Sequence, residues 1–242
     1  RKINDVVFFK NRLGLIAGEN IVLSEAGKFF NFYRTTARTI LDSDPIDVAS
    51  SSNVVATIKH GIPFNDQLIL FADQVQFSLS GGEILAPKTA SIAQTTAYES
   101  TLNAKPVVIG KNIYFTVTKG GYVGVREYFV NRLTTNYDTT DTTANIPKYI
   151  PGVIKKLSKS VTEDLLVSIA DGDRTKLFVY KFYWNVDEKL QSSWSKFTWQ
   201  ETDANFSLLF AEFINSILYL VIQRTDGVYL EKMNLSSGYT DE

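Results

Sequence analysis

The chain has 242 residues, of which 44% are hydrophobic and 13% aromatic, including 16 Phe and 12 Tyr. This share of apolar side chains can build a packed core, and it excludes an intrinsically disordered protein. The 25 basic and 26 acidic residues leave a formal net charge of -1. Bulk charge therefore gives no argument for attraction to nucleic acid or to a membrane surface.

The rarest residue types exclude several kinds of chemistry. The chain has no cysteine, which excludes disulfides and thiolate metal sites, and its single histidine is His60. No apolar run approaches the length of a membrane span and no signal peptide is recognisable, so we expect no membrane span. Because the chain begins with Arg1 and ends soon after its last expected strand, we expect a piece of a longer protein.

Residues 11–24 have the pattern of a β-hairpin. Leu13, Leu15 and Ala17 alternate with the residues between them, a Gly-Glu-Asn turn follows at 18–20, and residues 21–23 begin the return strand. Alternation of this length, with Gly and Asn at the turn, predicts two antiparallel strands. The four consecutive apolar residues at 6–9 predict a further strand that leads into the hairpin.

The same pattern recurs four more times. Each unit opens with two polar residues, continues with three apolar residues two positions apart, and ends with a polar turn and another alternating strand. The first apolar residues of the five units, which we expect to be buried at equivalent positions, are Leu13, Leu68, Ile113, Leu165 and Ile217. These positions lie about 45 to 55 residues apart.

A period of this length predicts a series of small sheets. A repeat of roughly 40 to 50 residues with several strands is typical of a β-propeller, whose blades bury their faces against each other. An ordinary β-sandwich is the alternative, but its turns should recur every ~8 to 12 residues without a longer period. We therefore predict an all-β, propeller-like array of about five antiparallel blades with very little helix, in a single domain over residues 1–242.

The segments between the hairpins are less regular. Strands are predicted at 54–60, at 107–110 and at 194–199, the last as the outer strand of the fourth unit. The other segments are predicted as a turn or short helical turn at 24–33, a loop at 39–47, an extended segment at 88–104 and an exposed, Thr-rich loop at 133–145.

The single histidine and several groups of acidic residues are candidates for catalysis or calcium binding. His60 stands at a strand end, and without a Gly-x-Ser-x-Gly motif to supply a nucleophile we expect it to be a hydrogen-bonded strand residue. Residues 42–47 contain three aspartates but lack the Gly and distal Glu of a calcium loop, so a turn capped by Asp side chains is expected. A hairpin turn is expected at 171–174. The pairs Glu163-Asp164 and Asp187-Glu188 could serve a glycosidase, although adjacent acids at hairpin starts are usually solvated.

Glycines, lysines and tryptophans also have structural explanations. Gly81-Gly82 and Gly120-Gly121 lack the sequence context of a phosphate-binding loop. Three lysines lie close together in the sequence, at Lys155, Lys156 and Lys159. We expect them on a solvated strand face, with a nucleic-acid contact as the alternative. The three tryptophans are Trp184, Trp194 and Trp199. They could stack on sugars or bases, but aromatic residues in strands more often pack between sheets. We predict no catalytic, cofactor-binding or metal-binding residues.

Several blocks of sequence, in a fixed order, resemble a known family. The longest is residues 5–24, and the others are 30–32, 44–47, 63–77, 109–115, 146–151, 181–183 and 191–195. In order and spacing these blocks resemble the tail tubular protein B family, the nozzle proteins of short-tailed phages. Proteins of that family are much longer, so the resemblance implies that this chain is a central portion.

The resemblance implies a structural role. It implies a propeller-like part of a phage tail tube in the virion, forming in the full-length protein a sixfold homo-oligomeric ring that contacts the adaptor tail tubular protein and, as a further contact, tail fibres. It also implies a channel through which DNA passes without sequence-specific binding. The family motif carries no catalytic residues, so we expect no enzyme and no cofactor.

The competing hypothesis is a β-propeller that binds or hydrolyses a cell-surface polysaccharide. A hydrolase would need two inward-facing acids about 5 to 9 Å apart, whereas acids scattered on hairpin turns favour a scaffold. A carbohydrate-binding propeller would show exposed aromatic side chains in a pocket.

Overall fold

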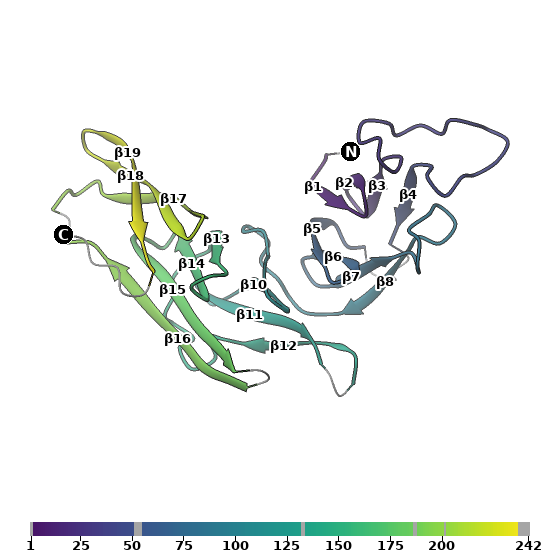
Figure 1. Cartoon of the computed structure of the whole chain (residues 1–242). Helices are drawn as coiled ribbons and strands as arrows, with labels where there is room; N and C mark the ends of the chain where they lie inside the picture. Colours follow the sequence, from purple (N-terminus) through teal and green to yellow (C-terminus); the bar gives the residue numbers. More distant parts are fainter. Residues whose placement is uncertain (1, 51–54, 132–133, 186–187, 201, 237–242) are drawn as a thin grey trace. The chain divides into compact units, whose positions relative to one another are not determined.

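The computed structural model describes residues 2–50, 55–131, 134–185, 188–200 and 202–236, and the regular secondary structure of this part is all β-strand (Figure 1). The strands form five antiparallel sheets, four with four strands and one with three. The predicted all-β fold of about five antiparallel blades is thereby confirmed.

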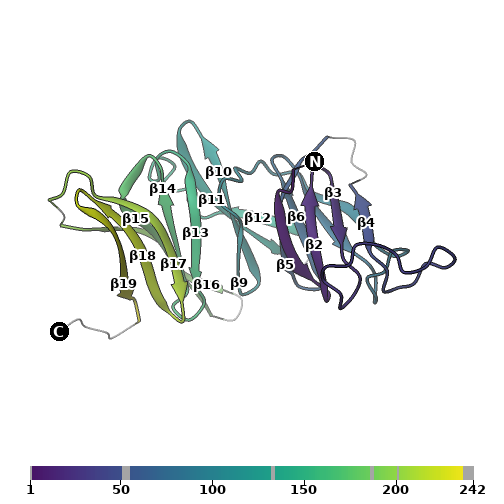
Figure 2. The same ribbon diagram turned by 90° about the horizontal axis from the view of Figure 1, so that it is seen from above.

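The sheets follow one another along the chain. The first consists of β1 (Asp5–Phe9), β2 (Arg12–Ala17), β3 (Asn20–Leu23) and β4 (Ile46–Ala49). The second consists of β5 (Ile58–Phe64), β6 (Gln67–Ala72), β7 (Gln76–Ser80) and β8 (Ser91–Thr96). The third consists of β9 (Val107–Ile109), β10 (Asn112–Lys119), β11 (Tyr122–Val130) and β12 (Tyr137–Asp141). The fourth consists of β13 (Ile154–Ser160), β14 (Leu165–Ala170), β15 (Asp173–Asn185) and β16 (Glu188–Thr198). The fifth consists of β17 (Ser207–Ile214), β18 (Ile217–Arg224) and β19 (Gly227–Asn234), which run side by side in Figure 2.

Strands that are neighbours in a sheet are also neighbours in the chain, because short turns suffice to join antiparallel strands. The turn between β17 and β18 shows how the sequence achieves this. Asn215 and Ser216 both have positive φ angles, of 49° and 68°. Two-residue turns of this kind match the twist of the paired strands, and Asn tolerates the left-handed conformation better than most residues.

The five repeated hydrophobic positions all lie at the start of the second strand of a sheet. Leu68, Ile113 and Leu165 are buried as predicted. The prediction is wrong for Leu13 and Ile217, which are only half-buried. In β2 and β18 the buried residues belong to the opposite face of the strand and are Arg12, Ile16, Leu218, Leu220 and Ile222.

Gly14 explains why the alternation of residues in β2 indicates the wrong face as buried. A Cβ atom at this position would lie 2.7 Å from the side chain of Val7 and 2.8 Å from that of Leu23. The neighbouring strands therefore pack directly onto the glycine backbone, and the face that appears polar and small in the sequence is the one that is covered.

Two predictions about the connecting segments need correction, and a third, the turn at 24–33, is confirmed. The exposed loop predicted at 133–145 is wrong, since β12 lies within it and pairs with β11, while Leu133 lies outside the described residues. The strand predicted at 54–60 begins at Ile58 in the structure, and Val54 lies outside the described residues. The segment 24–33 forms turns, one of which is closed by the bond from Lys28 N to the Glu25 carbonyl at 3.0 Å.

The chain divides into two compact units, residues 1–102 with 130–138, and residues 103–129 with 139–242. The core of the first unit lies between the first and second sheets and includes Ile16, Leu70 and Phe77. The second unit has two cores, one between the third and fourth sheets and one between the fourth and fifth. A single domain over residues 1–242 stays a prediction.

Candidate interaction surfaces

His60 joins three parts of the first unit. It lies in β5, its Nε2 atom is 3.0 Å from the Leu102 carbonyl oxygen, and its Nδ1 atom is 3.7 Å from Asp5 Oδ2. The same Asp5 oxygen accepts a hydrogen bond from Gly61 N at 3.0 Å. His60 is therefore a hydrogen-bonded strand residue, as predicted, and its contacts position backbone segments.

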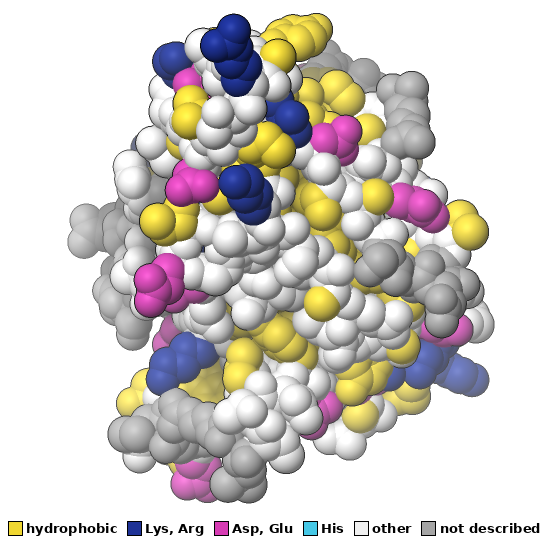
Figure 3. All heavy atoms as spheres, turned by 90° about the vertical axis from the view of Figure 1, so that its right-hand side faces the viewer, with side chains coloured by type: hydrophobic (Ala, Val, Ile, Leu, Met, Phe, Trp, Pro, Cys, Tyr) yellow, Lys and Arg dark blue, Asp and Glu magenta, His cyan; other side chains and the backbone are white. Residues whose placement is uncertain are grey.

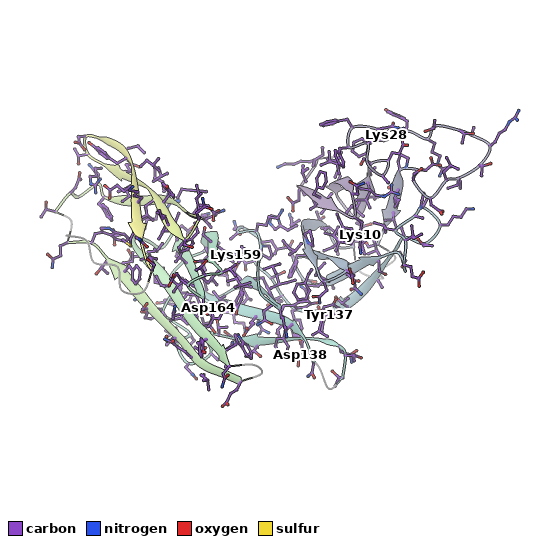
Figure 4. The ribbon with its side chains drawn as sticks, in the orientation of Figure 1. Lys10, Lys28, Tyr137, Asp138, Lys159 and Asp164 are labelled. Carbon is purple, nitrogen blue, oxygen red and sulfur yellow. The ribbon has the colours of Figure 1, made fainter. Side chains whose placement is uncertain are left out.

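The acidic residues are used in turns. Asp44 is buried and accepts a hydrogen bond from Leu41 N at 2.9 Å, which is the predicted Asp-capped turn. Asp171 accepts a hydrogen bond from Val153 N at 2.6 Å, and this bond is the main cause that lowers the pKa of its carboxyl group. Asp164, labelled in Figure 4, has a positive φ of 50° in the turn between β13 and β14. Asp187 lies outside the described residues.

No group of three or more possible metal-binding side chains occurs in the described ranges. A shallow pocket in the second unit is lined by Thr175, Lys176, Thr198, Trp199, Asp203 and Phe206. Its carboxylate is already engaged, because Asp203 accepts hydrogen bonds from the backbone N of Thr225 at 2.7 Å and from its hydroxyl at 2.6 Å. These bonds lower the pKa of Asp203, and the bond from the Thr225 hydroxyl has the largest effect. The carboxylate of this pocket therefore stabilises a turn, and its oxygens are occupied by hydrogen bonds from Thr225.

The three lysines predicted to form a solvated face differ in their surroundings. Lys155 is exposed and lies 3.3 Å from Asp171. Lys156 contacts Glu212 at 2.5 Å and lies over the ring of Phe210. Lys159, labelled in Figure 4, is half-buried and donates to the Val108 carbonyl oxygen, and burial lowers its pKa. The prediction is therefore right for Lys155 and wrong for Lys159.

Two of the tryptophans pack between sheets, as predicted. Trp194 donates from Nε1 to the Thr142 carbonyl at 3.2 Å and stacks near Tyr180, with ring centroids 5.1 Å apart. Trp199 lies 5.8 Å from Phe206, ring to ring. Trp184 is 39% exposed, but the ammonium group of Lys189 lies 5.0 Å from its ring centroid.

A buried charged cluster, which the sequence reasoning did not identify, joins the third and fourth sheets. Glu127 in β11 is 2% exposed and accepts hydrogen bonds from Asn112 at 2.6 Å and from the Tyr114 hydroxyl at 2.8 Å. Its other oxygen forms an ion pair with Lys189 of β16. Burial, followed by the charge of Glu127, raises the pKa of Tyr114. The cluster links the two sheets through a carboxylate whose two oxygens both have partners.

Arg12 organises the long connection between β3 and β4. The side chain is 1% exposed, and its guanidinium group donates at 2.7 Å to each of the carbonyl oxygens of Ser24, Asp42 and Asp44. Burial lowers the pKa of Arg12. Since Ser24 precedes the connection and Asp44 ends it, one side chain holds both ends of the segment together. We call residues 26–41 the β3–β4 loop.

The β3–β4 loop exposes aromatic and basic side chains. Phe30 is 90% exposed and Tyr33 is 83% exposed, and Arg34 and Arg38 are also exposed. No acidic residue occurs between positions 26 and 41. Tyr, Phe and Arg are side chains that protein interfaces favour, so this loop is a candidate interaction surface of the first unit.

The signal for Arg12 and Glu127 in the sequence was their position in alternating strands. Arg12 occupies a strand position two residues before the small Gly14, and Glu127 lies among apolar residues in β11. Alternation assigns Glu127 to the core face of β11 together with Val123 and Val125, whereas it assigns Arg12 to the face opposite Leu13. A charge on a predicted core face indicates either that the face is assigned wrongly or that the buried group has all its hydrogen-bond partners. For Glu127 the structure shows the second case.

The fold and these clusters define a class of protein: an all-β scaffold built from successive blade-like sheets. The β-propeller domain of Cps50 (Swd1) from Myceliophteria thermophila superimposes with a TM-score of 0.55, covering 98% of this chain and 74% of that chain at 12% identity. The N-terminal domain of Nup159 superimposes with a TM-score of 0.51, covering 95% of this chain and 56% of that chain at 11% identity. At these identities the similarity concerns the fold alone.

The chain belongs to the bacteriophage nozzle protein family, whose model matches residues 1–242. It is 34% identical over 240 residues to tail tubular protein gp12 of Escherichia phage T7. This match covers 99% of the chain but 30% of the length of the T7 protein. Membership of this family makes the chain a structural protein of a phage tail, located in the virion, as the sequence resemblance implied.

Proposed function

We propose that the chain forms part of the wall of the conduit through which a phage genome leaves the particle. The observation that carries this proposal is the match of the nozzle family over all 242 residues, together with a scaffold in which charged and polar side chains serve packing and turns. The chain acts as one propeller-like domain of a longer protein, and that protein forms a sixfold ring that contacts the adaptor tail tubular protein and tail fibres.

The proposal requires DNA to pass without tight binding. Each phosphate that a protein neutralises adds affinity, so a conduit lined by many lysines and arginines would slow the DNA. A formal net charge of -1 suits this requirement. On the face drawn in Figure 3, Lys and Arg side chains alternate with Asp and Glu, and neither sign gathers into one large patch.

We further propose that the protein is not an enzyme. Glu163 and Asp164 lie in the turn between β13 and β14, Glu188 lies in strand β16, and the single histidine is held between backbone segments. The polysaccharide hypothesis would need exposed aromatic side chains in a pocket. Trp199 and Phe206 do line the pocket of the second unit, but their rings pack against each other, and Trp194 packs against Tyr180.

Electron microscopy of the complete protein, mixed with its adaptor, tests the proposal. We expect sixfold rings with an open centre. Particles without rotational symmetry would contradict the ring. Turnover of a cell-surface polysaccharide that is lost in Asp164→Asn or Glu163→Gln would contradict a purely structural role.

A further inference from the structure

The fifth sheet is covered on one face only. In β6, β10 and β14, runs of consecutive residues are buried, so both faces of these central strands are covered. In β18 burial alternates: Leu218, Leu220 and Ile222 are buried, and the residues between them are not. The buried set packs against Val167 and other residues of the fourth sheet.

The uncovered face carries large apolar side chains from all three strands. The pairing register places Phe210 opposite Val221 and Ile214 opposite Ile217 on one side, and Leu230 opposite Val221 on the other. We define the open face of the fifth sheet as Phe210, Ile214, Ile217, Val221, Val228 and Leu230. Leu230 is 71% exposed, Val228 61% and Ile214 54%.

Such a face is unusual for a sheet that ends in solvent. Antiparallel sheets with one solvated face normally place polar residues there, and large contiguous apolar patches mark interaction sites. On this face, Glu212 is paired with Lys156 near one margin, and Lys232 lies opposite Tyr219. These charged residues flank Tyr219 in one row across the face, and the row of Phe210, Val221 and Leu230 beside it is apolar, so the partner must be largely apolar.

The fifth sheet also has fewer strands than the others. In each of the first four sheets a fourth strand follows the third, whereas β19 is the last strand within the described residues. The third strand of the second sheet, β7, is buried from Gln76 to Leu79. In β19 the residues from Val228 to Leu230 are all exposed. The third strand is thus covered on both faces in the second sheet and left exposed in the fifth.

We propose that the open face of the fifth sheet is covered by a further antiparallel sheet from the same longer polypeptide, outside residues 1–242. This inference rests on the proposal that the chain is one part of a longer nozzle protein. The chain covers 30% of its T7 relative and between 56% and 74% of two propellers that it resembles, so both comparisons leave room for more sheets. The expected partner presents Val, Ile, Leu or Phe from alternating strand positions, as the fourth sheet does toward Leu218 and Leu220.

Hydrogen exchange of the β18–β19 hairpin tests the proposal. We compare the 242-residue chain with the monomeric fraction of the complete protein, without adaptor, so that the result does not depend on ring formation. Amides of residues 227–234 should exchange at least about tenfold more slowly in the complete protein, because covered strands open only in larger unfolding events. Leu230→Lys should remove most of this difference, since a charge would be buried without a partner.

Leu190→Lys is the matched control. Leu190 is a leucine of similar exposure, 56%, in β16 at the outer edge of the complete fourth sheet. This variant should leave the protection of residues 227–234 unchanged. Equal exchange of this segment in the short chain and the complete protein would overturn the proposal. A concentration-dependent dimer of the short chain that Leu230→Lys dissociates would overturn it too, since a second copy would then cover the face.

Discussion

Arg12 shows how a single side chain can hold together the two ends of a long connection. A buried charge is costly unless its hydrogen-bonding groups are satisfied, and the guanidinium group of Arg12 meets this need with backbone carbonyl oxygens from both ends of the β3–β4 loop. The fork of five donors in arginine is suited to several acceptors at once, which lysine cannot match.

Replacing Arg12 should therefore destabilise the first unit. We expect Arg12→Ala to lower the free energy of unfolding by more than about 3 kcal/mol, because several buried carbonyl groups lose a charged donor. Arg12→Lys should recover only part of this loss. Chemical denaturation measures both, with the exposed Arg34→Ala as a control expected to cost under about 0.5 kcal/mol. Equal midpoints for Arg12→Ala and Arg34→Ala would contradict this role.

Asp171 should make the stability of the folded protein depend on pH in the acid range. The hydrogen bond from Val153 N is the main cause that lowers the pKa of this carboxyl group in the folded protein. Its contribution is therefore fully present above the unfolded pKa of about 3.9 and is lost as pH falls through the lower folded pKa. Asp171→Asn should make thermal unfolding less sensitive to pH below about pH 4 than it is in the unaltered chain. An unchanged slope would count against this assignment.

At the scale of elements, the depth of burial depends on the position of a strand within its sheet, most clearly in the second, third and fourth sheets. β6, β10 and β14 are buried over almost their whole length, whereas the outer strands β4 and β12 are largely half-buried or exposed. Substitutions should therefore matter according to strand position within a sheet more than according to hydrophobicity alone.

Ile113 and Thr140 test this gradient within the third sheet. Ile113 in β10 is fully buried, and Thr140 in β12 is exposed. Ile113→Ala should cost roughly 2 to 5 kcal/mol by deleting buried volume. Thr140→Ala should cost under about 0.5 kcal/mol. Similar midpoints for the two variants in chemical denaturation would show that the second strand is not the centre of the sheet.

The ion pair between Glu127 and Lys189 tests how the third and fourth sheets are joined. Glu127→Ala should cost about 3 to 5 kcal/mol, because it leaves Lys189 and two other buried polar groups without their acceptor. The double variant with Lys189→Met should cost less than the sum of the two single changes. A double-mutant cycle measures this coupling, and strict additivity would mean that the pair does not connect the sheets.

At the scale of the molecule, successive antiparallel sheets that pack against each other suit a particle part that must stay rigid. The first unit has one hydrophobic core and the second has two. Edges of sheets are sites of unwanted pairing, and the four-stranded sheets end in outer strands with many polar residues, such as Tyr137–Asp141.

Assembly should depend on more than these 242 residues. We expect the chain alone to be monomeric or weakly associated in solution, and the complete protein with its adaptor to form sixfold rings. Light scattering on both preparations measures this. A stable hexamer of residues 1–242 would show that this part alone drives assembly.

The local pattern of the sequence was enough to determine the strands and their repetition. Alternation and turn residues depend on neighbours a few positions apart, so the hairpins at Leu13, Leu68, Ile113, Leu165 and Ile217 were located correctly. The absence of a catalytic motif and the resemblance to nozzle proteins also follow from order and spacing along the chain, without any three-dimensional information.

The tertiary structure alone decided which face of each strand is buried. A period of two is the same for both faces, so alternation cannot distinguish the Leu13 face of β2 from the Arg12 face. Arg12 can be buried because Ser24, Asp44 and Leu85 supply carbonyl oxygens, and these residues come together only in the folded chain. In the same way β12 became a strand because β11 offered it an edge, despite a sequence without a hydrophobic period.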